Sequence, residues 1–178
     1  MVVAQSSAMS ESAKVGERWV EMEVKGLLLD PASETPVLLL QSVGGTIVLP
    51  IWIGQSEANA IAMALEGLRE PRPMTHDLMH DMLRELAVEL YRVEIEALRE
   101  GTFHGRLRLR QGSVEHQVDS RPSDAIALAV RCGATIWVVQ EVLDEALQLD
   151  LLTTGDEEER LREWLDKVRP EDLGKYTM

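Results

Sequence analysis

The stretch from residue 114 to residue 133 places the strongest limit on how this chain can fold. Residues 114–118 alternate between apolar and polar side chains, which predicts a half-buried strand. Pro122 then suits the first position of a helix, because the N–H that proline lacks would have no partner there. The next residues are apolar on nearly every side as far as Gly133, which favours a left-handed helix end. We therefore expect a buried helix that begins directly after a strand.

The start of this helix is polar for a buried element. Two aspartates, two serines and an arginine gather there, namely Asp119, Ser120, Arg121, Ser123 and Asp124. A carboxylate at Asp124 can accept hydrogen bonds from free N–H groups and oppose the positive end of the helix dipole. Two interpretations stay open: a functional site, or a helix cap with a structural arginine–aspartate pair.

Composition limits the class of protein. The 178 residues suffice for one domain with a core, and no window approaches the ~18 apolar residues of a membrane span. Residues 1–17 lack a cationic start followed by an apolar segment, so we interpret them as a disordered lead. Cys132 is the only cysteine, which rules out an intrachain disulfide and a thiolate zinc site. We expect a cytoplasmic protein with no membrane partner.

The net charge of −13 is unevenly distributed. Nucleic-acid-binding proteins usually carry a basic footprint, and this chain as a whole does not. Residues 141–178 hold twelve acidic and five basic residues. The acidic excess is therefore concentrated in the C-terminal tail.

Hydrophobic periodicity predicts both strands and helices. Strands are expected at residues 20–29, 37–41, 46–53, 90–97, 102–110, 113–119 and 135–139, and helices at 54–66, 75–86, 122–132, 141–151 and 156–168. These segments indicate an α+β fold, with an antiparallel or mixed sheet of about six to seven strands and packed helices. We divide the chain into a disordered lead (1–17), one domain (18–143) and an acidic helical tail (144–178).

Three blocks of the sequence resemble the bifunctional nuclease (BFN) domain. They are LPIWIG at 49–54 followed by Glu57 and Ala58, RPMTHDL at 72–78, and RPSDAIALA at 121–129, with GTF at 101–103 between the last two. The resemblance covers residues 20–143 and implies a compact α+β domain. It also implies a phosphodiester hydrolase, because the family is named for plant members that degrade RNA and DNA. The acidic tail lies outside the resemblance.

Phosphodiester cleavage requires an activated nucleophile and stabilisation of charge on the phosphate. Two solutions are open here: carboxylates that hold a divalent metal such as Mg²⁺ or Mn²⁺, or a histidine acid–base pair with an arginine clamp. The catalytic candidates are His76, Asp77, His104, Asp119 and Asp124; the substrate-binding candidates are Arg72, Arg106 and Arg121; the metal-binding candidates are Glu57 and Asp124.

Simpler structural roles are open for several of these residues. Thr75 and Asp77 can cap the helix that follows Pro73, which would leave His76 exposed. Arg72 can form a structural salt bridge. Glu57 falls in the first turn of a helix, where a carboxylate commonly acts as a cap.

The hairpin lengths predict one further arrangement. If residues 99–101 and 111–112 form the loops, then Glu96, His104 and Asp119 lie in one row across three strands. Glu94 then faces Arg106 on the same side of the sheet. This row would suit acid–base chemistry on a phosphate. The alternative is a solvated face of cross-strand charge pairs, each contributing little.

The sequence therefore favours a BFN-type nuclease that hydrolyses RNA or DNA with little sequence preference, with or without a divalent metal. The alternative is a non-enzymatic protein-interaction module, or a binder of small anions, on the same fold. Residues 48–53, which include Trp52, form an apolar surface suited to a second copy, so we expect a homo-oligomer.

Overall fold

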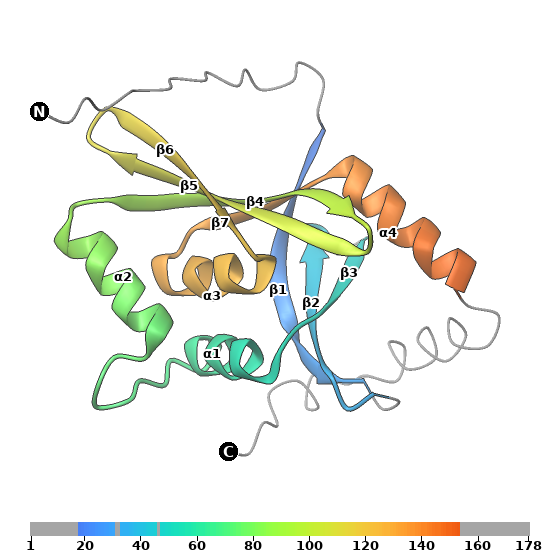
Figure 1. Cartoon of the computed structure of the whole chain (residues 1–178), viewed down its shortest axis with the longest axis horizontal. Helices are drawn as coiled ribbons and strands as arrows, with labels where there is room; N and C mark the ends of the chain where they lie inside the picture. The colour runs from blue at the N-terminus through green and yellow to red at the C-terminus, as the bar shows by residue number, and fades with distance from the viewer. Residues whose placement is uncertain (1–17, 31–32, 46, 154–178) are drawn as a thin grey trace, which may run out of the picture.

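The computed structural model describes residues 18–30, 33–45 and 47–153, which form one seven-stranded sheet and four helices (Figure 1). The strands are β1 (Trp19–Leu29), β2 (Pro36–Ser42), β3 (Val48–Trp52), β4 (Glu89–Arg99), β5 (Thr102–Gln111), β6 (Val114–Ser120) and β7 (Thr135–Val139). The helices are α1 (Gln55–Leu65), α2 (Thr75–Glu85), α3 (Pro122–Cys132) and α4 (Gln140–Thr153). The lead at 1–17 and the helix expected at 156–168 lie outside the described residues.

The strands follow the order β3-β2-β1-β7-β4-β5-β6 across the sheet. Neighbouring strands are antiparallel except β4 and β7, which are parallel. The sheet is therefore mixed, and the expected α+β fold is confirmed. No helix among the described residues combines the length and the apolar character needed to cross a membrane.

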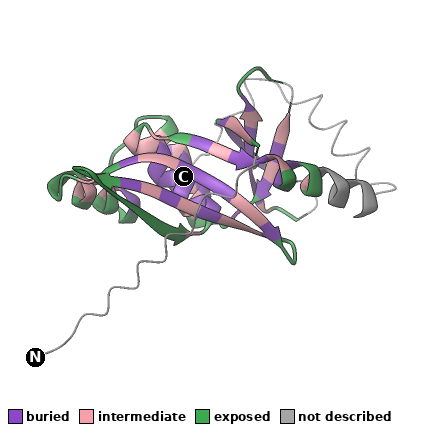
Figure 2. Cartoon of the chain, turned by 90° about the horizontal axis from the view of Figure 1, so that it is seen from above, coloured by how far each residue is buried: buried purple, intermediate pink, exposed green. Residues whose placement is uncertain are grey.

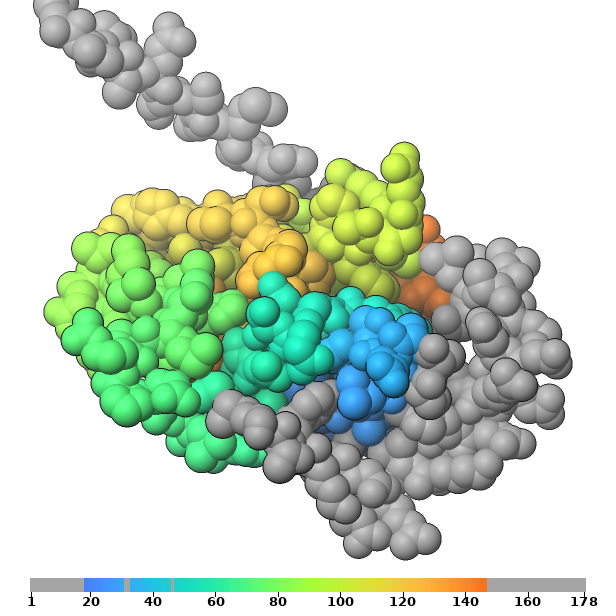
Figure 3. Space-filling view, turned by 60° about the horizontal axis from the view of Figure 1, so that its bottom comes forward, coloured from blue at the N-terminus to red at the C-terminus, as the bar shows by residue number. Residues whose placement is uncertain are grey.

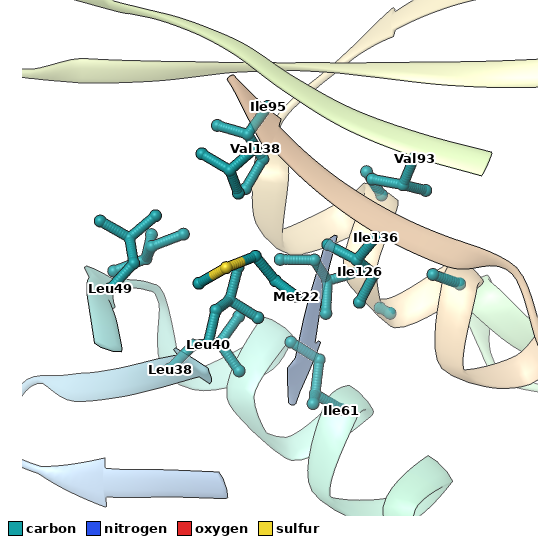
Figure 4. Packing of buried hydrophobic residues seen from close by; sticks show 14 of the residues in the cluster. Met22, Leu38, Leu40, Leu49, Ile61, Val93, Ile95, Ile126, Ile136 and Val138 are labelled. Carbon is teal, nitrogen blue, oxygen red and sulfur yellow. The ribbon is translucent and has the colours of Figure 1, made fainter. Parts of the chain in front are cut away.

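α3 is the central helix of the molecule. It contacts α1, α2, β4, β5 and β7, and Figure 1 shows it beside α1. Ile126 is fully buried, and Figure 4 places it near Met22, Ile61 and Ile136. The helix ends at Gly133 with a φ of 67°, a left-handed conformation that glycine adopts without steric cost. The predicted buried helix after a strand is confirmed.

α2 is packed more loosely than the periodicity of its sequence suggests. His76 is its only buried residue. Four members of its apolar stripe are exposed, namely Leu78, Met79, Met82 and Leu86. The prediction that Thr75 caps this helix is wrong, because the helix starts one residue earlier. Met74 occupies the cap position, and its N–H donates to Asp77 Oδ2 at 3.1 Å.

Candidate functional site

Four polar side chains meet where three helices begin. Glu57, His76 and Asp124 lie in the first turns of α1, α2 and α3 respectively. Arg121 immediately precedes α3 in an extended conformation, and Figure 3 shows the start of α3 at the surface next to α1. The first turn of a helix has backbone N–H groups without intrahelical partners, so each helix start adds partial positive charge. We call these four residues the polar cluster.

Asp124 is at the centre of the hydrogen bonds in the polar cluster. Its Oδ1 lies 3.2 Å from His76 Nε2. Arg121 donates from Nε to Asp124 Oδ2 at 2.7 Å and from Nη2 to Asp124 Oδ1 at 3.1 Å. The same Nη2 also donates to Glu57 Oε1 at 2.8 Å. These contacts connect the starts of α2, α3 and α1.

The members of the polar cluster differ in exposure. The side chain of His76 is 10% exposed and that of Arg121 is 66% exposed, with Asp124 between them at 29%. A buried imidazole held by a carboxylate thus lies close to an accessible guanidinium. This arrangement suits proton transfer beside an anion, because Asp124 orients the His76 imidazole and the Arg121 guanidinium is accessible to an anion from solvent.

Ion pairing controls the charges in the polar cluster. Burial disfavours the ionised form of Asp124, but hydrogen bonds from Arg121 and His76 outweigh burial and hold the pKa of Asp124 below its ordinary value. Hydrogen bonds to Asp124 and then to Glu57 raise the pKa of the Arg121 guanidinium. Asp124 and Arg121 are therefore both ionised at neutral pH.

A groove with a volume of about 880 Å³ extends from the polar cluster along α2. Its apolar walls come from α2, α3, β5 and β6, and they include Met79, Met82, Leu83, Leu86, Leu107, Leu109, Val118 and Leu128. Grooves of this size and polarity, with a few polar groups at one end, are typical of small-molecule and substrate sites.

Asp77 lies in a second ion pair. Its Oδ1 accepts from Arg131 Nε at 2.6 Å, and Arg131 also donates from Nη1 to the Ala127 carbonyl at 2.9 Å. The hydrogen bond from Arg131 outweighs burial and lowers the pKa of Asp77. Arg131 is at the end of α3, whereas Asp124 is at its start. Asp77 therefore holds α2 to α3 at a position separate from the polar cluster.

Gly105 fixes the position of Arg121 through a close backbone approach. A Cβ at Gly105 would lie 3.0 Å from the Ser120 carbonyl oxygen and 3.2 Å from the Pro122 nitrogen. Both atoms belong to the junction between β6 and α3. This junction carries Arg121, so the absence of a side chain at Gly105 lets the polar cluster assemble where it does.

The expected row of Glu96, His104 and Asp119 does not form. His104 faces Ala97 in place of Glu96, because β4 has a bulge at this point. Asp119 faces Arg106, because residues 112–113 form the turn after β5 and the register differs from the expected one. Asp119 lies at the edge of the groove, and side-chain alternation puts His104 and Arg106 on the sheet face opposite to the one that α3 covers.

The outer face of the sheet carries a ladder of charge pairs. The expected facing pair of Glu94 and Arg106 is confirmed as a register pair. The ion pairs run diagonally, however: Glu94 contacts Arg108 at 2.7 Å and Glu96 contacts Arg106 at 2.6 Å. Arg106 thus contributes to cross-strand pairing on a face separate from the polar cluster.

The residues expected to bind a metal do not fit a resident ion as they are arranged. Arg121 donates to both Glu57 and Asp124, so a cation already occupies the position between the two carboxylates. Within the described part of the chain, no group of three or more His, Cys, Asp or Glu side chains is arranged to hold a metal. Arg72, a substrate-binding candidate, is exposed before α2 and is not part of the polar cluster.

Sequence reasoning missed two groups of side chains. One is Arg131. The available signal was its position as a lone charged residue in the last turn of α3, after a run of apolar residues. The other is a set of aromatic contacts on the outer sheet face, where Arg92 stacks over Trp19 and Trp137 at 5.0 and 4.6 Å from the ring centres. The aromatic partners are far from Arg92 in sequence, so periodicity gave no sign of them.

Comparison with known proteins confirms the family resemblance. Residues 38–149 match the bifunctional nuclease domain. An uncharacterized protein found in two strains of Mycobacterium tuberculosis is 42% identical over 162 residues, which cover 86% of this chain and 97% of the relative. Bifunctional nuclease 1 of Oryza sativa is 28% identical over 118 residues, covering 65% of this chain and 36% of the relative. Bifunctional nuclease 1 of Arabidopsis thaliana is 28% identical over 116 residues, covering 64% and 36%.

The domain match contains all four residues of the polar cluster and the strands and helices that position them. The match covers β3 to β7 and α1 to α3 in full, and β1 lies outside it. This chain belongs to the bifunctional nuclease domain family.

Proposed function

We propose that this chain is a BFN-type nuclease that hydrolyses phosphodiester bonds in RNA or DNA at the polar cluster. The observation that carries the proposal is the buried His76, which lies 3.2 Å from Asp124 and close to the exposed Arg121. The names of the plant relatives support the reaction class, although this chain matches only 36% of their length.

Each member of the polar cluster has a role in this proposal. The contact of His76 Nε2 with Asp124 leaves Nδ1 for proton transfer. Nδ1 accepts the proton of the attacking water as the water oxygen bonds to phosphorus and the bond to the leaving oxygen breaks. The leaving oxygen keeps the electron pair of that bond and takes a proton from solvent water. The exposed guanidinium of Arg121 contacts the phosphate oxygens and stabilises their charge while its Nε and Nη2 stay bonded to Asp124 and Glu57. Little sequence preference follows, because contacts to phosphate carry no sequence information.

A second function on the same fold is a protein-interaction module, which includes the binding of small anions at Arg121 as a variant. The exposed apolar side chains of α2 favour this function. In addition, Glu57 and Asp124 together outweigh the charge of Arg121, which opposes the approach of a phosphate. In this case the polar cluster serves to hold three helix starts together.

The experiment that separates these functions is cleavage of labelled single-stranded RNA and DNA by the purified full chain. Parallel reactions contain Mg²⁺, Mn²⁺ or a chelator, and an Arg121→Ala, Asp124→Ala double variant is purified identically. Cleavage that is lost in the double variant supports the nuclease. The metal and chelator reactions then show whether a divalent ion takes part. No cleavage by the wild-type chain on any substrate would overturn the nuclease and favour the interaction module.

A further inference from the structure

β6 forms one outer edge of the sheet, and β5 is its only partner among the described strands. Its register with β5 runs without a bulge from Ser120 to Val114. Six of its seven residues are exposed, and Figure 2 shows an outer strand exposed along nearly its whole length. A regular, uncovered edge strand presents a row of backbone N–H and C=O groups to any strand that can pair with it.

The opposite edge of the sheet is less suited to pairing. β3 has only five residues, and Pro50 in its centre has no N–H to donate. Trp52 is 46% exposed, but its Nε1 donates to Asp30 at 3.4 Å within the same chain. Residues 48–53, where the sequence predicted self-association, are therefore the poorer of the two edges.

An apolar surface lies next to the free edge of β6. Met79 and Met82 of α2 are 42% and 53% exposed, Leu86 directly after α2 is 60% exposed, and Val118 of β6 is 44% exposed. All four side chains line the same groove, so they form one continuous surface and are not scattered over the molecule. Continuous apolar surfaces of this kind mark sites of association.

We propose that β6 pairs antiparallel with β6 of a second copy of this chain, which joins two sheets and covers the apolar stripe of α2. The partner has to bring a free strand edge with an apolar surface beside it. A second copy brings both in the same arrangement, because a two-fold interface is formed by the same surface on each subunit.

The charges on β6 select the register of this pairing. A two-fold axis perpendicular to the sheet keeps each side chain on its own face. Residues that face each other across the axis are then separated by an even number of positions in the sequence, so the axis passes between the two copies of one residue of β6. An axis at Glu115 would place two glutamates opposite each other, and an axis at Gln117 would place Glu115 opposite Asp119. Like charges directly opposite each other are destabilising, so both registers are unfavourable.

An axis at His116 avoids these conflicts. It places Val114 opposite Val118 of the second copy on the helix side and Glu115 opposite Gln117 on the outer side. It also keeps all of residues 114–118 paired. Of the three registers compared, we therefore place His116 on the two-fold axis.

The register is tested by Gln117→Glu in the full chain. Gln117 accepts a hydrogen bond from Arg106 Nη1 at 2.7 Å, and a glutamate can accept it equally well, so the subunit itself is preserved. Across the proposed axis the new glutamate faces Glu115, so we expect the dissociation constant of the dimer to rise several-fold. Adding Glu115→Lys to Gln117→Glu restores an attractive pair and should restore the dimer.

The surface is tested by Val118→Glu with Val43→Glu as its matched control. Val43 is 63% exposed in the turn after β2, away from β6, so the control makes the same chemical change outside the proposed interface. Sedimentation velocity over a concentration series should show a reversible dimer for the wild type and Val43→Glu, and a monomer for Val118→Glu. A wild-type chain that is monomeric at every concentration, or variants that all dimerise like the wild type, would overturn the proposal. This readout is mass, so it is independent of nuclease activity.

Discussion

Asp77 and Asp124 both ionise more readily in the folded chain than their ordinary pKa of 3.8 implies. The hydrogen bond from Arg131 is the main cause at Asp77, whereas at Asp124 the bonds from Arg121 and His76 overcome the opposing effect of burial. Unfolding returns both pKa values toward 3.8. Between the folded and unfolded values the unfolded state binds more protons, so the free energy of unfolding rises with pH.

We therefore expect the stabilisation from these two carboxylates to be fully present above about pH 5 and to be lost as the pH falls through their folded pKa values. Urea unfolding at a series of acidic pH values measures this dependence. Asp77→Asn should reduce stability at neutral pH by about 1–3 kcal/mol, because it leaves the buried Arg131 without its anion. The same variant should also flatten the acid dependence.

The control for this variant is Asp81→Asn on the same helix. Asp81 has a 39% exposed side chain and lies 3.5 Å from Arg84 in a surface pair. Surface pairs of this type contribute about 0–1 kcal/mol, so the control should stay near the wild type. An equal loss of stability in both variants would show that Asp77 does not hold α2 to α3.

Gly105 gives a second prediction at the residue scale. Gly105→Ala should lower the free energy of unfolding by about 1–3 kcal/mol, because the new methyl group would press on rigid backbone at Ser120 and Pro122. Gly54→Ala is the comparison, since its methyl group meets only the flexible end of Glu57 and should cost under about 1 kcal/mol. Thermal melts of the two variants provide the measurement, and equal melting temperatures would contradict the prediction.

The sequence predicted the local contacts of the polar cluster better than the distant ones. Arg121 and Asp124 are three residues apart, so helix geometry alone anticipated their pairing. The contact between Arg131 and Asp77 spans 54 residues, and it depends on how α2 lies against α3. The burial of His76 depends on the same packing, which no local pattern encodes.

At the scale of the elements, α3 and α2 have the same length, 11 residues, but opposite environments. Ile126 of α3 is completely buried, whereas Met82 of α2 is 53% exposed. Ile126→Ala should therefore cost about 2–5 kcal/mol of unfolding free energy, because it leaves a cavity in the core. Met82→Ala should cost under about 1 kcal/mol. Chemical denaturation of both variants tests the contrast, and similar losses would mean that α2 is packed as firmly as α3.

Periodicity predicted both helices, but it does not encode which elements pack against each of them. The apolar stripe of α2 has the spacing of a buried helix face, yet the described residues leave most of it open beside the groove. The hairpins show the same limit. Their strands were predicted correctly, but one bulge in β4 and a turn at residues 112–113 changed which side chains face each other.

At the scale of the whole molecule, the sheet order explains why the polar cluster assembles. β7 lies between β1 and β4, so the N-terminal strands and the β4–β6 meander form one continuous surface for the helices. The starts of α1 and α3 then meet on that surface, although 64 residues separate Glu57 from Arg121. The sequence predicted the α+β class and the strand count. It did not predict the parallel pairing of β4 with β7, because strand order depends on long-range contacts.

In the proposed reaction, His76 transfers a proton during phosphodiester hydrolysis. The most direct test is the rate of cleavage of single-stranded RNA and DNA by His76→Gln, with His80→Gln as the control. Glutamine can keep the hydrogen bond to Asp124 but cannot transfer the proton, and His80 lies one turn further along α2, with its Nδ1 3.9 Å from Asp81.

We expect His76→Gln to keep its melting temperature and to lose about 10²–10⁴-fold in rate, while His80→Gln cleaves like the wild type. Cleavage by His76→Gln at the wild-type rate would contradict this role of His76.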